Sequence, residues 1–232
     1  METENKIVPS YEGALRSLMV PVPAVISKCS GIRIFGRRIK SFIFSTDAAI
    51  IKNSNADAVI AVYPFTPQPA ITRAVITAAD MPVFAGIGGG TTSGFRVVRL
   101  GCDAEDQGAG GVVVNAPIPN DVIRSLKEHL DIPIVVTVVS DRTDVAARVE
   151  AGASIINISG SRDTARIVRA IREKFPHLPI IATGGPTEES ILATIEAGAN
   201  AVTYTPPTTG ELFGAMMQKY REMIVEDSAG EC

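Results

Sequence analysis

Eight short apolar runs, each followed by a stretch with the composition of a helix, fill the chain from residue 41 towards its C-terminus. Each run is rich in Val, Ile and Ala and nearly free of charge, which is typical of parallel strands that their crossover helices bury on both faces. Eight such units in 232 residues predict an α/β fold, a single (β/α)8 TIM barrel. The predicted strands are Ser41–Thr46, Ala58–Phe65, Pro82–Gly88, Gly111–Ala116, Pro133–Val139, Ser154–Ser159, Pro179–Gly184 and Ala201–Thr205.

The residues between the runs support this count. Proline opens the third, fifth and seventh runs, where it ends the preceding helix without removing a ladder hydrogen bond. Glycine turns precede the fourth, sixth and eighth runs, as suits the residue that closes a helix. The alternative is an open doubly wound sheet, but such sheets more often have about five or six strands.

Three segments follow from the pattern. Residues 41–225 form the predicted barrel, which leaves no room for a second domain. Residues 1–40 form an N-terminal extension that we expect to cap the bottom of the barrel, with contact to a second copy of the chain as the alternative. Residues 226–232 are expected to be a frayed C-terminal tail.

The extension itself has recognisable elements. Tyr11–Met19 is predicted to be a short helix. Gly31–Phe35 and Ile39–Phe44 are predicted to be two strands, joined at Gly36, Arg37 and Arg38. The second of them runs directly into the first barrel strand, so the extension is expected to be a helix followed by a hairpin.

Composition excludes several classes of protein. The net charge of −3 and the mixing of acids with bases leave no basic surface for nucleic acid. The polar N-terminus is unlike a secretory signal, and no apolar run approaches the ~20 residues that span a bilayer. The three cysteines follow neither a metal-binding nor a disulfide pattern. We therefore expect a cytoplasmic protein that needs no metal or other cofactor.

The predicted rim of the barrel lacks two common catalytic side chains. His129 and His177 both precede a strand at a helix C-terminus, on the rim that carries stability. This placement argues against a Ser-His-Asp relay or a histidine-ligated zinc. No predicted strand ends in lysine. The amine for Schiff-base chemistry would have to come from Lys6 or Lys28 of the extension.

Acids, amides and hydroxyls remain as catalytic candidates at the strand ends. Asp47 and Asp141 follow the first and fifth strands, where apolar walls can raise a carboxyl pKa into a useful range. The alternative for both is helix capping. Three further candidates, from successive strands, can hydrogen-bond a substrate carbonyl or remain a polar layer inside the barrel; these are Asn115, Thr137 and Asn157.

Two glycine-rich loops are candidates for anion binding. Free backbone N–H groups and hydroxyls after the third strand can form a concavity for an anion, unless the loop is only a mobile lid. That loop contains Gly88, Gly89, Gly90, Thr91 and Thr92. The loop after the seventh strand offers Thr183, Gly184 and Gly185, with Arg142 or Arg162 to hold the charge. The other expected ligand contacts are Ser161, Tyr204 and Thr205.

Two resemblances follow from these motifs. Residues 180–185 (IIATGG), followed by Glu196-Ala197-Gly198-Ala199, resemble the closing half of the ribulose-phosphate-binding barrels. The resemblance implies the fold of phosphosugar epimerases, aldolases and synthases, with phosphate held after strands seven and eight. The segment Thr205-Pro206-Pro207-Thr208 departs from that group, because prolines supply no N–H donors.

A second resemblance spans nearly the whole chain. Residues 61–69 (AVYPFTPQP), 88–92 and 204–208 are similar to those of an uncharacterised bacterial barrel family that is labelled as hydrolases. The likeness implies the fold more than the chemistry, because a fold hosts many functions. No nucleophile or metal site accompanies the label.

These observations predict an enzyme of small-molecule metabolism. Its ligand is expected to be an anionic, phosphorylated or carboxylated, sugar-like metabolite, converted by Asp-mediated proton transfer in a lyase, isomerase or hydrolase reaction. One alternative is a non-catalytic regulatory barrel that binds a phosphorylated metabolite, similar to the glycerol-3-phosphate-responsive antiterminators. Another is a flavin-binding oxidoreductase. We expect no nucleic-acid or membrane partner, and a homo-oligomer stays open.

Overall fold

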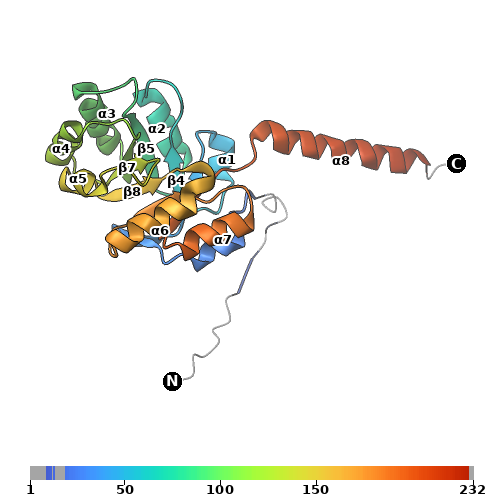
Figure 1. The fold of residues 1–232 in the computed structure, drawn as a ribbon. Coiled ribbons are helices and arrows are strands. Elements are labelled where there is room, and N and C mark those ends of the chain that lie inside the picture. The colour runs from blue at the N-terminus through green and yellow to red at the C-terminus, as the bar shows by residue number, and fades with distance from the viewer. Residues whose placement is uncertain (1–8, 12, 14–18, 230–232) are drawn as a thin grey trace.

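The computed structural model describes residues 9–11, 13 and 19–229. Eight parallel strands close into a barrel in chain order, with the last strand paired to the first (Figure 1). The predicted (β/α)8 barrel is therefore confirmed. The barrel strands are β3 (Ser41–Phe44), β4 (Ala58–Ala61), β5 (Val83–Gly88), β6 (Gly111–Val114), β7 (Ile134–Val138), β8 (Ile155–Ile158), β9 (Ile180–Thr183) and β10 (Ala201–Tyr204).

Helices follow each strand, and the helices up to α7 surround the barrel (Figure 1). Capping side chains fix where several of them begin. Thr187 and Ser190, for example, form a capping box at the start of α7. The helices are α1 (Ala48–Lys52), α2 (Pro69–Ala78), α3 (Phe95–Asp106), α4 (Asn120–His129), α5 (Val145–Glu150), α6 (Thr164–Lys174), α7 (Glu188–Glu196) and α8 (Thr209–Ala229), with the 3-10 turns η2 (Ala24–Lys28) and η3 (Ser161–Asp163). No helix of the described residues is long and apolar enough to cross a membrane.

The two-residue period of the strands sorts their side chains between two cores. In β8, Ile156 and Ile158 face the helices and belong to the large outer core, whereas Ile155 belongs to the core inside the barrel. Asn157, two residues beyond Ile155, therefore points inward at the carboxyl end of the barrel. In this way each strand brings an inward residue to the rim where barrel enzymes carry their chemistry.

A hairpin contributes to the core at the opposite end of the barrel. Strands β1 (Ile32–Ile34) and β2 (Arg37–Ile39) pair antiparallel. Their isoleucines pack in one cluster with Phe42 and Ala58, which lie at the starts of β3 and β4. The floor of the barrel is thus partly built from residues that precede β3.

The hairpin turn is tighter than the sequence led us to expect. The turn consists of Phe35 and Gly36, and Arg37 and Arg38 belong to β2 rather than to the turn. Both turn residues have positive φ, +45° at Phe35 and +82° at Gly36, as the two-residue turn of a twisted hairpin requires. The predicted helix at Tyr11–Met19 lies mostly outside the described residues.

The segment between Val20 and Cys29, which contains η2, covers the outside of the barrel between α7 and α1. Its Ile26 and Cys29 pack against Val202 of β10 and Ile191 of α7. Its Val20 packs in one cluster with Ile43 of β3 and with residues of α1. Val202 and Ile43 are fully buried as a result, so this segment does the covering that an eighth outer helix provides in other barrels.

Helix α8 instead projects away from the barrel (Figure 1). It continues to Ala229 and so includes the first four residues of the expected C-terminal tail, 226–232. The sequence explains the length, because no glycine or proline occurs between Gly214 and Gly230.

Candidate functional site

The carboxyl ends of the barrel strands surround a cavity of about 340 Å³, which we call the mouth cavity. Its polar lining comes from inward positions of β6 to β10 and the residues that follow them, and its apolar lining comes mainly from β3 and β4. The lining residues are Phe44, Ile60, Val62, Val113, Asn115, Thr137, Asn157, Ser159, Thr183, Thr203 and Thr205. Three of the predicted catalytic residues, Asn115, Thr137 and Asn157, are therefore brought together here.

The polar groups of the mouth cavity are incompletely paired. Thr137 and Asn157 are opposite each other in the ladder of β7 and β8, and the Asn157 amide donates to the Thr137 hydroxyl at 3.3 Å. Asn157 Oδ1 and Thr203 Oγ1 are buried without a hydrogen-bond partner among the described residues. Buried polar groups are almost always paired, so these two unpaired oxygens are candidate contacts for water or for a ligand with hydrogen-bonding groups.

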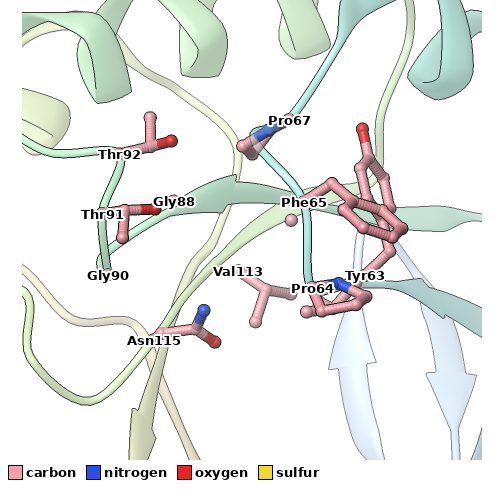
Figure 2. Close-up of a pocket in the computed structure, with 12 residues that line it drawn as sticks. Tyr63, Pro64, Phe65, Pro67, Gly88, Gly90, Thr91, Thr92, Val113 and Asn115 are labelled. Atoms are coloured by element: carbon pink, nitrogen blue, oxygen red, sulfur yellow. The ribbon is translucent and has the colours of Figure 1, made fainter.

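A second cavity of about 250 Å³ adjoins the mouth cavity and shares Val62, Val113 and Asn115 with it. We call it the loop cavity. In Figure 2 the loop from Gly88 to Thr92 forms one side, the segment from Tyr63 to Pro67 forms the other, and Val113 and Asn115 lie between them. The predicted ligand contacts Gly88, Gly90, Thr91 and Thr92 all line this cavity.

Close backbone approach explains the glycines of this loop. Gly89 has φ +102°, and a Cβ atom there would lie 2.6 Å from the backbone nitrogen of Asn115, so a larger residue would collide. The Gly89 N–H donates to the Thr92 carbonyl, and the Asn115 N–H donates to the Gly88 carbonyl, both at 2.9 Å. The loop is thus held against Asn115, which belongs to both cavities.

A third cavity, of about 600 Å³, lies between the beginnings of α6 and α7. We call it the arginine cavity, because Arg162 lines it together with Ser161, Thr183, Gly184 and Gly185. These are five of the predicted ligand contacts. Thr183 also lines the mouth cavity, so both spaces border the end of β9. The arginine cavity places Arg162, which favours an anion, near the N-terminus of α7. The first turn of that helix also carries Glu188 and Glu189.

Asp47 lies outside all three cavities and caps α1. Its Oδ1 accepts from the N–H groups of Ala49 and Ile50, at 2.8 and 3.3 Å. Its Oδ2 accepts from the Thr209 hydroxyl at the start of α8. The pKa of Asp47 is lowered, mainly by the hydrogen bond from Thr209 and further by the two N–H groups. This environment keeps the carboxylate ionised and occupied, which does not support its predicted role as an acid–base group.

Asp141 and Arg142 line a groove on the outside of the barrel, between α5 and α6. Arg166 of α6 forms an ion pair with Asp141 at 2.6 Å, and its hydrogen bond is the main cause of the lowered pKa of Asp141. The structure therefore brings neither Asp141 to the mouth as a proton carrier nor Arg142 as an anion contact. The physical reason is local, because the chain turns outward after β7 to begin α5.

The strand alternation also corrects the end of β10. Tyr204 packs with Val202 and Ile191 in the outer core, whereas Thr203 and Thr205 face the mouth cavity. Thr203 was therefore not among the predicted site residues. Ser159 follows the sixth strand as a polar rim residue but was not among the predicted ligand contacts. A count of inward positions at every second residue, carried on from Ala201 of the inner core, finds Thr203 and rejects Tyr204.

The site is uncharged apart from Arg162. Among the described residues that line the mouth and loop cavities, Tyr63 is the one titratable side chain, and its hydroxyl accepts from the N–H of Gln68 at 2.8 Å. The same described lining includes no lysine for a Schiff base. The described part of the chain also contains no group of three or more His, Cys, Asp or Glu residues placed to hold a metal ion.

Comparison with known proteins gives similarity of fold. No protein-family model matches the chain, and a search of curated proteins finds no match. Among solved structures, phosphonopyruvate hydrolase in complex with oxalate and Mg²⁺ has a TM-score of 0.61 at 15% identity, covering 82% of this chain and 83% of that chain. The lyase for 2,3-dimethylmalate, a member of the PEP mutase/isocitrate lyase superfamily, has a TM-score of 0.61 at 15% identity, covering 81% and 82%.

A third similar structure is the 4-hydroxy-tetrahydrodipicolinate synthase of Methylacidiphilum fumariolicum SolV, with a TM-score of 0.56 at 16% identity, covering 71% of this chain and 67% of that chain. At these identities the likeness shows the (β/α)8 barrel. It supports the barrel part of our expectation but not the ribulose-phosphate-binding group in particular.

Proposed function

We propose that the protein is an enzyme that binds a small, oxygen-rich carboxylate or phosphate ester across the mouth and arginine cavities. The anionic group of this ligand lies by Arg162 and the start of α7. Its hydroxyl or carbonyl groups lie among the amides and hydroxyls of the mouth cavity. Because Thr183 lines both cavities, a molecule with a charged end and a neutral polar end would reach both by passing the end of β9.

Three buried side-chain oxygens have no partner among the described residues. The observation that carries this proposal is that two of them, Asn157 Oδ1 and Thr203 Oγ1, belong to residues that line the mouth cavity. An amide oxygen accepts only, so a ligand group that satisfies Asn157 must donate. A hydroxyl of the ligand meets this requirement, whereas a bare carboxylate does not. The mouth cavity is therefore suited to the hydroxyl-bearing or enol part of a ligand.

The same groups suit a reaction through an enol-like intermediate. The side-chain amide of Asn115 and the hydroxyls of Thr137 and Thr203 line a partly apolar space, where hydrogen bonds to developing negative charge are stronger than in water. These groups suit the oxygen of an enolate formed at a carbon next to a carbonyl in a lyase or isomerase step. The described lining of the mouth cavity has no carboxylate, lysine or histidine, so we assign the proton that leaves this carbon to water or to a basic group of the substrate itself. We assign no proton transfer to Asp47 or Asp141, because neither lines the mouth.

Names of the similar structures support the ligand class. Oxalate, phosphonopyruvate and 2,3-dimethylmalate, which the names of two of them mention, are small carboxylates. One of them also contains Mg²⁺. Hard cations are held mainly by carboxylates, and the described lining of the mouth cavity has none, so the residues present do not fit a comparable metal site. We derive no step through a metal.

The absence of a carboxylate or lysine among the described residues of the mouth favours a second candidate, a non-catalytic barrel that binds such a metabolite and reports it. The two candidates share the binding site and differ in turnover. Incubation of the protein with a ligand that binds, followed by NMR of the ligand, separates them. Conversion supports the enzyme, and unchanged ligand at saturation supports the sensor.

Calorimetric titration tests the site itself. The probes are oxalate, phosphonopyruvate, inorganic phosphate and simple sugar phosphates. For a probe that binds, we expect Arg162→Ala to weaken binding about tenfold or more, since a charge-assisted contact is worth ~1.5–3 kcal/mol. Arg162→Lys keeps the charge and retains part of the affinity. Arg169→Ala, which removes an exposed arginine from the helix that follows, is the matched control.

The neutral half of the site needs its own variant. Asn157→Leu keeps the size of the side chain and removes its hydrogen bonds, so we expect it to weaken hydroxyl-bearing probes more than inorganic phosphate. Equal affinity of wild type, Arg162→Ala and Asn157→Leu for every probe that binds would contradict the proposed site. Failure of every probe to bind would contradict the ligand class.

A further inference from the structure

Helix α8 carries an apolar stripe that the described part of its own barrel does not cover. Phe213, Met216, Met217, Tyr220 and Met223 recur at helical spacing on one side. Phe213 is 62% exposed, Tyr220 50% and Met223 61%. The opposite side carries Glu211, Gln218 and Glu222, so the helix is amphipathic and its apolar side has no partner among the described residues.

The place where a barrel would receive this stripe is occupied. In a closed barrel the eighth helix packs over the last and first strands, which are β10 and β3 here. Their outward residues Val202 and Ile43 are already fully buried, covered by Ile26 and Val20 of the preceding segment. Folding α8 back onto the barrel would therefore bury its stripe against the outside of that segment rather than against the strands.

The direction in which α8 leaves is held by hydrogen bonds at its base. The Thr209 hydroxyl donates to Asp47, which is itself bonded to α1. Glu211 accepts from the N–H and the hydroxyl of Thr208, at 2.7 and 2.8 Å. Pro206 and Pro207 restrict the connection before it. These hydrogen bonds and prolines fix the direction in which the helix leaves the barrel. We call helix α8 the arm.

The stripe has a symmetry that identifies its partner. About a midpoint between Met216 and Met217, Phe213 and Tyr220 lie at equal distances along the chain. Two arms that run antiparallel would therefore place each Met216 opposite a Met217, and each Phe213 opposite the partner's Tyr220. Further out, Met223 would lie opposite Gly210, which leaves room for its side chain. A surface that matches itself under a two-fold rotation is what an isologous dimer requires.

The charges of the arm favour this partner over a polyanion. Over Thr209–Ala229 the arm has four acidic and two basic residues, so it has no basic face for nucleic acid or for an anionic membrane. Glu211 and Glu222 would come level with each other in the pair, but both lie on the side of the arm that faces away from the stripe. We propose that α8 is a dimerisation arm that pairs antiparallel with α8 of a second copy of this chain.

Sedimentation velocity on the full chain tests this, with charge variants at the two aromatic positions. We expect wild type to dimerise and Phe213→Glu alone to be monomeric, because it buries a carboxylate against the ring of Tyr220 in the second arm. Tyr220→Lys alone should weaken the dimer, because it replaces an aromatic contact with a charge that must leave water. Mixing the two single variants should restore a dimer, since the carboxylate introduced in one arm then faces the ammonium introduced in the other. The two positions are too far apart along one helix to pair with each other within an arm.

Glu222→Gln, on the polar side of the arm, is the matched control and should leave the dimer unchanged. Thermal unfolding of each variant checks that the barrel is intact. A wild-type chain that stays monomeric at the highest soluble concentration would overturn the proposal. So would a dimer that persists in Phe213→Glu, or single variants that are monomeric but do not recombine, because both outcomes place the contact elsewhere.

Discussion

Thr203 is the residue whose surroundings say most about the site. It is 7% exposed, and its hydroxyl has no partner among the described residues. An unsatisfied buried hydroxyl costs about 1–3 kcal/mol. Valine has the same shape without the hydroxyl, so Thr203→Val should raise the free energy of unfolding of the ligand-free protein by up to ~1 kcal/mol and weaken ligand binding. Thermal melts with and without a bound probe measure both effects.

The two effects of Thr203→Val must have opposite signs if the hydroxyl serves a ligand. Thr194→Val is a useful contrast, since Thr194 is also buried but its hydroxyl donates to the Ser190 carbonyl at 2.9 Å. That variant should lose stability. A Thr203→Val protein that is less stable yet binds normally would show that the hydroxyl has only a structural role.

Asp47 provides a prediction on pH. Its folded pKa lies below the ordinary value of 3.8, chiefly because Thr209 donates a hydrogen bond to it. Its contribution to stability is therefore fully present above pH 3.8 and is lost as the pH falls through the lowered pKa. Asp47→Ala removes the cap of α1 and should cost about 0.5–2 kcal/mol.

Denaturant unfolding of wild type and Asp47→Ala at a series of pH values measures this. The difference between the two should be constant above pH 3.8 and should shrink below it. Asp47→Asn, which caps nearly as well, should fall between them and show little dependence on pH in that range. A difference that grows on acidification would contradict this role for the carboxylate.

At the scale of elements, the hairpin stores local strain. Phe35 has φ +45° and is 70% exposed. A bulky residue with positive φ is unfavourable. An exposed ring buries little apolar surface that could offset this strain. Asparagine followed by glycine is the preferred pair for a two-residue hairpin turn. We expect Phe35→Asn to stabilise the protein by ~1 kcal/mol, measured by denaturant unfolding, with ligand binding unchanged because the hairpin lies at the far end of the barrel.

Phe35→Ala serves as the control for this change, since it removes the ring without supplying a residue that accepts positive φ. Its stability should stay close to that of wild type. If Phe35→Asn destabilises the protein, the ring itself contributes to packing that outweighs the strain of the turn.

The elements were easier to predict than the directions of their side chains. Eight apolar runs predicted eight strands because burial on both faces leaves a mark that does not depend on distant residues. Capping competes with catalysis for the same sequence signal, so the pattern left both roles open for Asp47 and Asp141. In the structure Asp47 caps α1, and Asp144, near Asp141, caps α5. Tyr204 was misplaced because its neighbour Thr203, rather than Tyr204 itself, shares the inward register of Ala201.

At the scale of the whole molecule, the sequence did not predict which segment covers the outside of the last strand. The apolar stripe of α8 has the pattern of a helix that packs on a barrel. The pattern does not distinguish packing on the barrel of the same chain from packing on a second copy. The competing segment at Val20–Cys29 has few residues and little periodicity. This segment covers the strands through contacts with Val202, Ile43 and Ile191, which lie far away in the sequence.

This division gives the molecule two parts of unequal stability. The barrel is closed and deeply packed, whereas an isolated helix of 21 residues is marginal in water unless its apolar side is covered. If pairing covers the arm, dilution should unfold it while the barrel remains. We therefore expect far-UV circular dichroism to lose helical signal as the protein is diluted from above to below the dissociation constant of the dimer, with no change in the melting temperature of the barrel.

A single variant of the arm sharpens this expectation. Gly214 has open space where a Cβ atom would be, so Gly214→Ala should raise helix stability by about 1 kcal/mol without creating a clash. Its helical signal should persist to greater dilution than that of wild type, whereas the signal of Phe213→Glu should be low at every concentration. Helical signal that is independent of dilution in wild type, while sedimentation shows the dimer dissociating, would mean that the arm is stable alone. The exposed stripe would then no longer require a second copy to fold.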